Sequence, residues 1–324
     1  MLGNALTAFR EIFDSHLSQL IPEYPKSLYA PMRYIAALPS KKLRPFLLHT
    51  FVKGYIKNNR NDLPEKYWDL AAAIELLHNF TLIHDDIMDE DDFRQGRKTV
   101  HNKWDMNTAI LGGDGLLALA FDVMSRGEME NFVHITREFS RSVLIVCEGQ
   151  ALDKEFEVLS TVDEQGYLDM IYKKTGSLIE ASSIIGGYAG DAPATEFEHI
   201  RQFGRNLGIA FQLRDDYLDI FAEQDELGKD IGSDLRMRKK TIIMIKLMQH
   251  GKTLKKIDTL ISDQNLRIDE IRSVLEDSGI ADETNELVKS YTDQAKKKLD
   301  SLSINEDSRS ILWELADYLE QRSH

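Results

Sequence analysis

The chain is poor in the residues that break helices and join domains. Its 324 residues include only 7 Pro and 19 Gly, and no stretch rich in Pro, Gly or Ser interrupts it. Inter-domain linkers commonly have such a composition. We therefore expect one domain over residues 1–324, which is long for a single domain and long enough to bury a large core.

Cysteine is almost absent as well. Cys147 is the only one, so no disulfide can form within the chain. This usage fits the reducing cytoplasm, where we expect the protein to reside. The opening residues, MLGNALTAFREIF, mix polar and apolar side chains and lack the apolar run of a secretion signal.

The sequence also lacks an excess of positive charge, long apolar runs and Gly-rich phosphate loops. A net charge of −14 argues against bulk binding to nucleic acid or to an anionic membrane. The longest apolar runs, such as LLALAF, span about six residues, and a membrane-spanning helix needs about 20. We expect no stable membrane insertion. Because neither GxxxxGK nor GxGxxG occurs, any phosphate ligand must be held by local cations or by metal.

What the sequence does have is helical periodicity. Apolar residues recur at spacings of three and four, as in Leu70, Ala73, Ile74 and Leu77. Strictly alternating β-branched runs are missing. The pattern predicts an all-α fold, a bundle of about ten or more helices.

The segment HDDIMDEDDFRQGRKTVH, residues 84–101, places six acidic residues in eight positions. The stretch from Tyr67 to about Asp92 contains no Gly or Pro, and we expect it to form one helix. At about 100° per residue, Asp85 and Asp89 then share a stripe, and Asp86 lies one step round. The same stripe carries Ile74, His78 and Thr81.

Like charges one turn apart destabilise a helix unless something neutralises them. A divalent cation would do so, and ligation by carboxylates alone suits Mg²⁺, which bridges to substrate phosphates. For this cluster taken alone, a solvated acidic helix end is an equal alternative.

A second segment, GIAFQLRDDYLDIF, repeats the arrangement. Asp215 and Asp219 lie one turn apart on a helical stripe with Gly208 and Gln212, and Asp216 lies beside them. Two such helices facing each other across a bundle could hold several Mg²⁺ ions between them. The repetition favours metal binding over a solvated face.

Clustered cations accompany the two acidic segments. Arginine and lysine are the usual holders of phosphate, although each of these side chains taken singly is more often a solvated one. Together with two metal-binding stripes they indicate a diphosphate clamp. The candidates are Lys41, Lys42 and Arg44 in LPSKKLRPF, Lys174 with Thr175 in YKKTGSLIEAS, and Lys229 and Lys239 in LGKDIGSDLRMRKKT.

These motifs closely resemble those of the trans-isoprenyl diphosphate synthases, the polyprenyl synthetase family, over residues 38–245. HDDIMDEDDFRQGRKTVH resembles the family's first aspartate-rich motif, DDxxDxxxxRRG, and FQLRDDYLD resembles the second. KKLRP resembles GGKRxRP, with Ser40 where a Gly is usual, and KTGSLIEAS resembles the KT motif.

The resemblance implies an all-α bundle around a deep cavity, usually a homodimer, with three Mg²⁺ per active site. It implies head-to-tail condensation of isopentenyl diphosphate with an allylic diphosphate. Carried over by position, the catalytic residues are Asp85, Asp86, Asp89, Arg94, Lys174 and Asp215. The metal ligands are Asp85, Asp89, Asp215 and Asp219, with Asp86 supporting them. The isopentenyl diphosphate site is Lys41, Arg44 and His78, and the allylic diphosphate site is Arg94, Lys174, Thr175, Gln212, Lys229 and Lys239.

Two positions depart from the family pattern. Gln95 follows Arg94 where the family has a second Arg that reaches isopentenyl diphosphate, so either Arg97 substitutes or binding is weaker. Arg238 stands where a Gly often precedes the Lys of the last motif, which puts the loop geometry around Lys239 in question.

Product length follows from the residues before the first motif. The growing hydrocarbon is expected to run back along the helix that carries Asp85. Phe80 lies five residues before it and Thr81 four. An aromatic at the fifth position only, with no insertion in DDxxD, resembles the archaeal-type geranylgeranyl synthases. We expect mainly the C20 product, geranylgeranyl diphosphate, with the C15 farnesyl diphosphate as the alternative.

Three other readings stay open. A class I terpene cyclase also uses DDxxD, but usually only once. A squalene or phytoene synthase would leave KKLRP unexplained. A catalytically silent partner subunit of a hetero-oligomeric synthase tends to lose aspartates, and none is lost here; Gln95 is the only departure that favours it.

Overall fold

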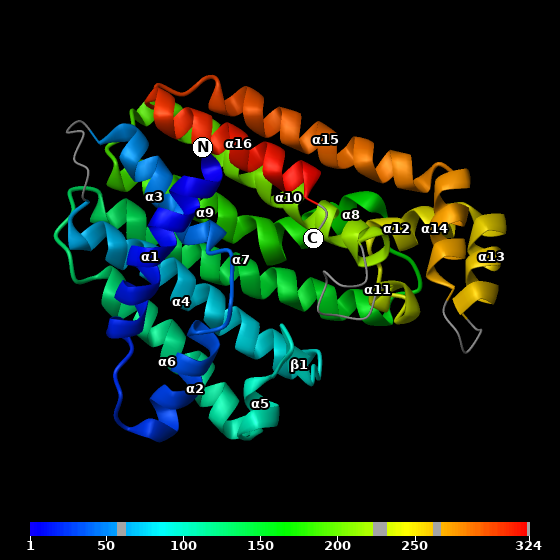
Figure 1. The fold of residues 1–324 in the computed structure, drawn as a ribbon, viewed down its shortest axis with the longest axis horizontal. Coiled ribbons are helices and arrows are strands. Elements are labelled where there is room, and N and C mark those ends of the chain that lie inside the picture. The colour runs from blue at the N-terminus through cyan, green and yellow to red at the C-terminus, as the bar shows by residue number, and fades with distance from the viewer. Residues whose placement is uncertain (57–62, 223–231, 262–266, 323–324) are drawn as a thin grey trace. The chain divides into compact units, whose positions relative to one another are not determined.

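The computed structural model describes residues 1–56, 63–222, 232–261 and 267–322, and within these ranges the chain is almost entirely helical (Figure 1). The predicted all-α class is confirmed. One expected site residue, Lys229, lies outside the described residues. The sole sheet in the described ranges is a two-residue-per-strand hairpin, β1 (Phe93–Arg94) with β2 (Arg97–Lys98).

The helices follow one another along the chain with short connections. In order they are α1 (Leu2–Leu20), α2 (Lys26–Ala36), α3 (Leu43–Tyr55), α4 (Glu65–Met88), α5 (Val100–Lys103), α6 (Met106–Met124), α7 (Phe132–Val158), α8 (Glu164–Ile171), the π-helix η1 (Tyr172–Gly176), α9 (Ser177–Ala189), the 3₁₀-helix η2 (Ala194–Glu196), α10 (Phe197–Phe221), α11 (Ser233–Arg236), α12 (Ile242–Gln249), α13 (Gly251–Ile261), α14 (Ile268–Asp277), α15 (Ile280–Leu299) and α16 (Glu306–Gln321).

The chain divides into two compact units, each assembled from three separate stretches. The first unit comprises residues 1–144, 178–204 and 298–315, and the second comprises 145–177, 205–297 and 316–324. Every boundary falls within a helix rather than in a linker. The composition of the chain therefore does not indicate where the two units meet in the sequence. The single domain expected from composition stays a prediction.

In the first unit, α4 is the central helix. It packs against α6, α3 and α2, and every residue from Leu70 to Leu77 is buried (Figure 1). Gly113 permits the close approach of α6, because a Cβ atom there would overlap the imidazole of His84 on α4. The full burial of α4 on several faces positions the aspartates at its end on a rigid support.

α6 combines an apolar composition with several exposed large apolar side chains. By length and composition it is the one described helix that could cross a membrane, yet a third of its apolar window is buried in the structure. Met106, Ile110 and Leu111 are each more than a third exposed. The short apolar runs in the sequence did not predict a helix of this length and apolar composition. Small residues such as Gly112 and Ala118 extend its apolar character between the bulky side chains.

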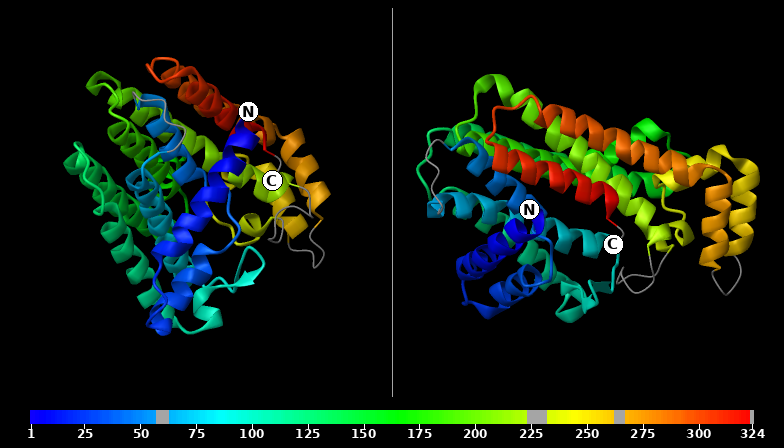
Figure 2. Two further views of the ribbon diagram at one scale, coloured as in Figure 1. Left: turned by 60° about the vertical axis from the view of Figure 1, so that its left-hand side comes forward. Right: turned by 45° about the horizontal axis from the view of Figure 1, so that its top comes forward.

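In the second unit, a core of aliphatic side chains joins α8, the end of α10, and α12, α13, α14 and α15. α13 and α14 lie side by side, as Figures 1 and 2 both show. Leu213, Ile243 and Leu275 are fully buried at its centre. This core supports the end of α10, where the second aspartate cluster lies.

Two glycines hold the π-helix η1 close to its neighbours in the second unit. A Cβ on Gly208 of α10 would lie 2.5 Å from the Cα of Gly176, and one on Gly149 of α7 would lie 2.6 Å from the backbone carbon of Lys173. Both clashes involve backbone atoms, which cannot rotate away. π-Bulges in helices often occur at functional sites, and here the bulge carries Lys174 and Thr175.

We predict that Gly149→Ala destabilises the protein. The added methyl overlaps the backbone of η1, and overpacking of this kind costs about 1–3 kcal/mol. Urea denaturation should show a lower midpoint at an unchanged slope. Gly251→Ala is the matched control, since a Cβ at Gly251 meets nothing within 4 Å. Equal midpoints for the two variants would contradict the close packing of α7 against η1.

Candidate active site

The first aspartate cluster lies at the C-terminal end of α4. The helix ends at Met88, with Asp89 as its cap, so the expected continuation to about Asp92 was wrong. Glu90 then takes a left-handed conformation, φ 54°, and the chain turns into the β1–β2 hairpin. Carboxylates at a helix C-terminus oppose the helix dipole, which favours an early end. Asp85 and Asp89 are half-buried on the last turn.

Asp86 has a different environment from its two neighbours. Its side chain is 1% exposed, and its Oδ1 accepts hydrogen bonds from Arg94 Nε at 2.7 Å and Nη2 at 2.6 Å. Burial raises the pKa of Asp86, and the bond to Arg94 opposes that rise. Asp86 therefore holds Arg94 in place, which fits the supporting role expected for it rather than direct metal ligation.

The hairpin that follows settles the geometry around Gln95. Gln95 and Gly96 form its two-residue turn with φ of 50° and 72°, the pattern of a type I′ turn. Arg97 pairs directly with Arg94 across the hairpin. Directly paired residues point to the same face, and two like charges there are unfavourable without an anion. Arg97 thus shares a face with Arg94, as substitution for the family's second Arg requires.

The expected isopentenyl diphosphate residues come from the start of α3 and the middle of α4. Arg44 Nη1 lies 3.2 Å from His78 Nε2. Burial lowers the pKa of His78 well below its usual value, and the charges of Arg44, Arg94 and Lys42 lower it further. The imidazole is therefore neutral and accepts the hydrogen bond that Arg44 donates. Lys41, beside this pair in the chain, is half-buried.

The two expected chain-length residues differ in burial. Phe80 is 8% exposed and packs edge-on against His84, with ring centroids 4.7 Å apart. Thr81 is half-buried, and its hydroxyl donates to the carbonyl of His78 at 2.8 Å. The small Thr81 side chain thus stays against its own helix, on the stripe that leads to Asp85.

The second aspartate cluster, in α10, is organised around a buried network. Asp216 accepts hydrogen bonds from the Tyr167 hydroxyl and from Gln212 Nε2, the latter at 3.0 Å. Gln212 Oε1 in turn accepts from the Thr175 hydroxyl at 2.9 Å. Burial raises the pKa of Asp216 to about 7, and the bonds from Tyr167 and Gln212 act in the opposite direction. Two expected site residues, Thr175 and Gln212, are thereby brought together.

Asp215 is bonded to Arg322, near the C-terminal end of the chain. Arg322 also donates to the carbonyl of Phe211 at 3.1 Å and lies over its ring. Its side chain is 6% exposed, whereas that of Asp215 is 39% exposed. Sequence reasoning missed Arg322, since a terminal QRSH carries no signal of a partner 107 residues earlier.

Asp219 lies one turn beyond Asp215, and both of its oxygens accept hydrogen bonds. Oδ1 accepts from the Ser233 hydroxyl at 3.0 Å, and Oδ2 accepts from the backbone N–H of Asp234 at 3.2 Å. Asp219 thus fixes the first turn of α11. Its expected role as a metal ligand stays a prediction.

A carboxylate that sequence reasoning missed, Asp153 of α7, gathers two expected allylic-site lysines. Lys174 Nζ lies 2.6 Å from Asp153 Oδ2, and Lys239 Nζ lies 3.9 Å from it. Burial alone would raise the pKa of Asp153, but the charges of Lys239 and Lys174 outweigh it and lower the pKa. One feature of the sequence could have indicated Asp153: it lies one turn after Gly149, on the helix that packs closely against η1.

Arg238, which stands where the family often has a Gly, has a glycine-like backbone conformation. It takes the left-handed conformation that Gly would take, with φ of 54°, and its guanidinium bonds Asp258 at 2.6 Å. A non-Gly residue pays roughly 1–2 kcal/mol for this conformation. The loop before Lys239 therefore keeps a glycine-like backbone.

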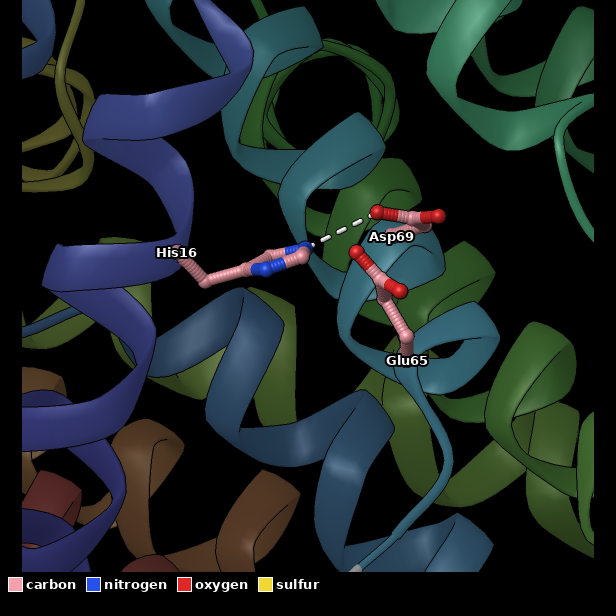
Figure 3. Close-up of side chains that lie close together, drawn as sticks. All are labelled: His16, Glu65 and Asp69. Atoms are coloured by element: carbon pink, nitrogen blue, oxygen red, sulfur yellow. Dashed lines mark hydrogen bonds and ion pairs between the residues drawn. The ribbon is translucent and has the colours of Figure 1, made fainter.

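A further group of possible metal ligands lies away from the first cluster, where α1 meets the start of α4 (Figure 3). His16, Glu65 and Asp69 offer donor atoms within 4.8 Å of one another. Asp69 Oδ1 lies 2.8 Å from His16 Nε2, and Glu65 is exposed. The hydrogen bond between His16 and Asp69 joins α1 to α4, and this structural role explains why these side chains lie together.

The donors at the two aspartate clusters suit Mg²⁺. Asp85, Asp89 and Asp215 supply half-buried carboxylate oxygens, which are the hard ligands this ion prefers. The bond from Arg322 shows that Asp215 takes a positive partner. The first cluster belongs to the first unit and the second to the second unit, so the expectation that they face each other stays a prediction.

Known proteins resemble this chain over nearly its whole length. It is 37% identical to the geranylgeranyl diphosphate synthase of Methanosarcina mazei, covering 96% of this chain and 95% of that one. It is 35% identical to the geranylfarnesyl diphosphate synthase of Natronomonas pharaonis, covering 99% and 98%. The crystal structure of geranylgeranyl pyrophosphate synthetase from Pyrococcus horikoshii Ot3 matches with a TM-score of 0.89 and 34% identity over 99% of both chains.

A family model places the chain among such enzymes. Residues 25–278, which include both aspartate clusters and the KKLRP and KT segments, match the model described as Polyprenyl synthetase. On this match, and on the identity shared with full-length relatives, the chain belongs to the polyprenyl synthetase family.

Proposed function

We propose that the protein is a Mg²⁺-dependent prenyltransferase that condenses isopentenyl diphosphate head-to-tail with allylic diphosphates, with geranylgeranyl diphosphate as the main product. One observation carries the proposal: two helices, α4 and α10, each end in paired half-buried aspartates backed by a buried third one. Relatives named as geranylgeranyl diphosphate synthases support the product class.

The departing diphosphate is the charge that the allylic site must stabilise. Three Mg²⁺ ions per site would be held by Asp85, Asp89, Asp215 and Asp219. As Lewis acids, these ions would neutralise that charge. Lys174 and Lys239 add cationic donors, and Asp153 fixes the first of them. Arg94 adds a guanidinium that Asp86 orients.

Isopentenyl diphosphate would be gripped by Lys41 and Arg44, with His78 orienting Arg44 through its hydrogen bond. Its double bond attacks the allylic carbon as the carbon–oxygen bond to diphosphate breaks. A proton then leaves the new chain. No side chain is needed as the base, because the departing diphosphate is basic and close.

We propose that α6 mediates a homodimer and that the dimer works in the cytoplasm. The exposed apolar side chains Met106, Ile110 and Leu111 lie on one helix, where a second copy could cover them. Groups of exposed apolar side chains commonly mark a protein interface when they form a patch. Net charge of −14 disfavours its use on an anionic membrane.

The direct test is product analysis with purified protein, Mg²⁺, isopentenyl diphosphate and each allylic primer. We expect a C20 diphosphate that requires both substrates and the metal. A hydrocarbon formed without isopentenyl diphosphate would instead identify a cyclase. Activity only after addition of a second subunit would identify a silent partner.

Under the same conditions, Asp85→Asn and Asp215→Asn should each lower kcat by at least about 10²–10³-fold, the effect of losing one principal electrostatic contact. Asp85→Asn should fold, because the substitution relieves repulsion between carboxylates. Asp215→Asn should fold as well, because the amide oxygen can still accept the hydrogen bond from Arg322. Asp122→Asn, at an exposed aspartate bonded to Arg126, is the matched control and should keep wild-type kcat. Near-normal turnover in either cluster variant would contradict the assignment.

Product length should respond to the two residues before the first cluster. Phe80→Ala removes bulk below the metal site and should lengthen the product beyond C20. Thr81→Phe adds bulk about one turn, roughly 6 Å, before Asp85 and should shift the product towards C15. Phe13→Ala, which removes a fully buried ring in α1, should leave chain length unchanged. If both α4 variants gave the wild-type distribution of product lengths, the residues that limit chain length would have to lie elsewhere.

The dimer proposal predicts that Leu111→Arg yields monomers. A charge buried in an apolar interface without a partner costs several kcal/mol, enough to shift a dimer of ordinary affinity. Light scattering after size exclusion should report half the wild-type mass. Val158→Arg, at an apolar side chain 85% exposed on α7, is the control and should remain dimeric. A monomeric wild type, or a dimeric Leu111→Arg, would overturn the proposal.

A further inference from the structure

Lys42 occupies an unusual backbone position next to the expected isopentenyl diphosphate residues. It caps the N-terminus of α3 with φ 51° and ψ 37°, the left-handed region. A residue with a Cβ atom pays roughly 1–2 kcal/mol to stay there, and such conformations persist only where the surroundings enforce them. The turn places Lys41 before α3 and Arg44 on its first turn.

A buried ion pair supplies that enforcement. Lys42 Nζ lies 2.8 Å from Glu75 Oε1 on α4, and the two side chains are 4% and 3% exposed. The same ammonium donates to the carbonyl of Ala36 at 3.4 Å. Burying two charges carries a desolvation penalty that often cancels their attraction, so such a pair is weak as a source of stability and better suited to fixing a geometry.

The pair belongs to a double attachment of this segment to α4. Glu75 and His78 lie one turn apart on α4, where Glu75 bonds Lys42 and His78 accepts from Arg44. The backbone between the two attachments is only three residues long. The rigid, buried part of α4 therefore sets the direction of both cations that flank Lys42.

Lys42 and Ser40 line a cavity of about 470 Å³ together with Arg10 and Asp14. Without the charge of Glu75, the Lys42 ammonium has room to move into this cavity. Asp14, which lines the same cavity, offers it another carboxylate there. The left-handed turn would then lose its anchor and relax.

We propose that Glu75 is a positioning residue for isopentenyl diphosphate: through Lys42, it holds the turn that directs Lys41 and Arg44 at the diphosphate. The inference rests on the proposed function and deepens it. Glu75 itself touches neither substrate. Its effect is confined to the isopentenyl site, because the allylic cations Lys174 and Lys239 are held by Asp153 instead.

The test uses Glu75→Gln, which keeps the shape of the side chain and removes its charge. We expect the KM for isopentenyl diphosphate to rise about tenfold, equivalent to about 1.4 kcal/mol. The KM for the allylic substrate and the kcat at saturation should stay within about twofold. Calorimetric titration with isopentenyl diphosphate alone should show the same loss of affinity.

Glu180→Gln is the matched control. Glu180 is also a buried glutamate in an ion pair, 2.6 Å from Arg201, but lies on α9. It should lower stability to a similar degree and leave both KM values unchanged. A rescue variant, Glu75→Gln with Lys42→Asn, removes the unpaired ammonium and installs a residue that tolerates the left-handed region. It should restore the KM for isopentenyl diphosphate to within about threefold.

Two results would overturn the inference while leaving the proposed function intact. One is an unchanged KM for isopentenyl diphosphate in Glu75→Gln, and the other is a parallel rise of both KM values, as general destabilisation would give. If wild-type protein neither binds nor consumes isopentenyl diphosphate, the proposed function fails, and the inference fails with it.

Discussion

Carboxylates one turn apart on a helix repel each other, and both aspartate clusters of this protein carry that repulsion at a helix end. Elements of the protein offset part of it. Arg94 bonds Asp86 in the first cluster, and Arg322 bonds Asp215 in the second. Under the proposed function, a divalent cation at Asp85, Asp89 and Asp215 would offset the remaining repulsion, and such a cation would in turn attract a diphosphate.

The two clusters divide their roles in the same way. In each, the second aspartate of the DD pair is buried and held by protein donors, Arg94 for Asp86 and Tyr167 with Gln212 for Asp216. The first aspartate of each pair stays half-buried. In each cluster one carboxylate is thus fixed by protein donors inside the fold, and the proposed metal ligands are its more exposed neighbours. Asp153 and Glu75 extend this principle to the lysines.

Sequence periodicity was sufficient for the helical class and for the stripes, because both depend on local spacing. It failed where tertiary contacts decide. Lys42, for example, is buried by a partner 33 residues away. The end of α4 at Met88 instead of about Asp92 has a local cause that periodicity does not report, because the carboxylates oppose the helix dipole. The role of Arg322 depends on a contact with Asp215, 107 residues earlier, which local spacing does not reveal. The division into two units escaped notice because its boundaries fall within helices. The roles of Lys229 and the facing of the clusters stay predictions.

The measurement that tests this account most directly is the location of Mn²⁺ by anomalous diffraction, in crystals grown with the metal and inorganic diphosphate. The account predicts Mn²⁺ on the carboxylates of Asp85 and Asp89 and on that of Asp215, with Arg322 withdrawn from Asp215. Mn²⁺ bound only at His16, Glu65 and Asp69, with both aspartate clusters lacking metal, would contradict it.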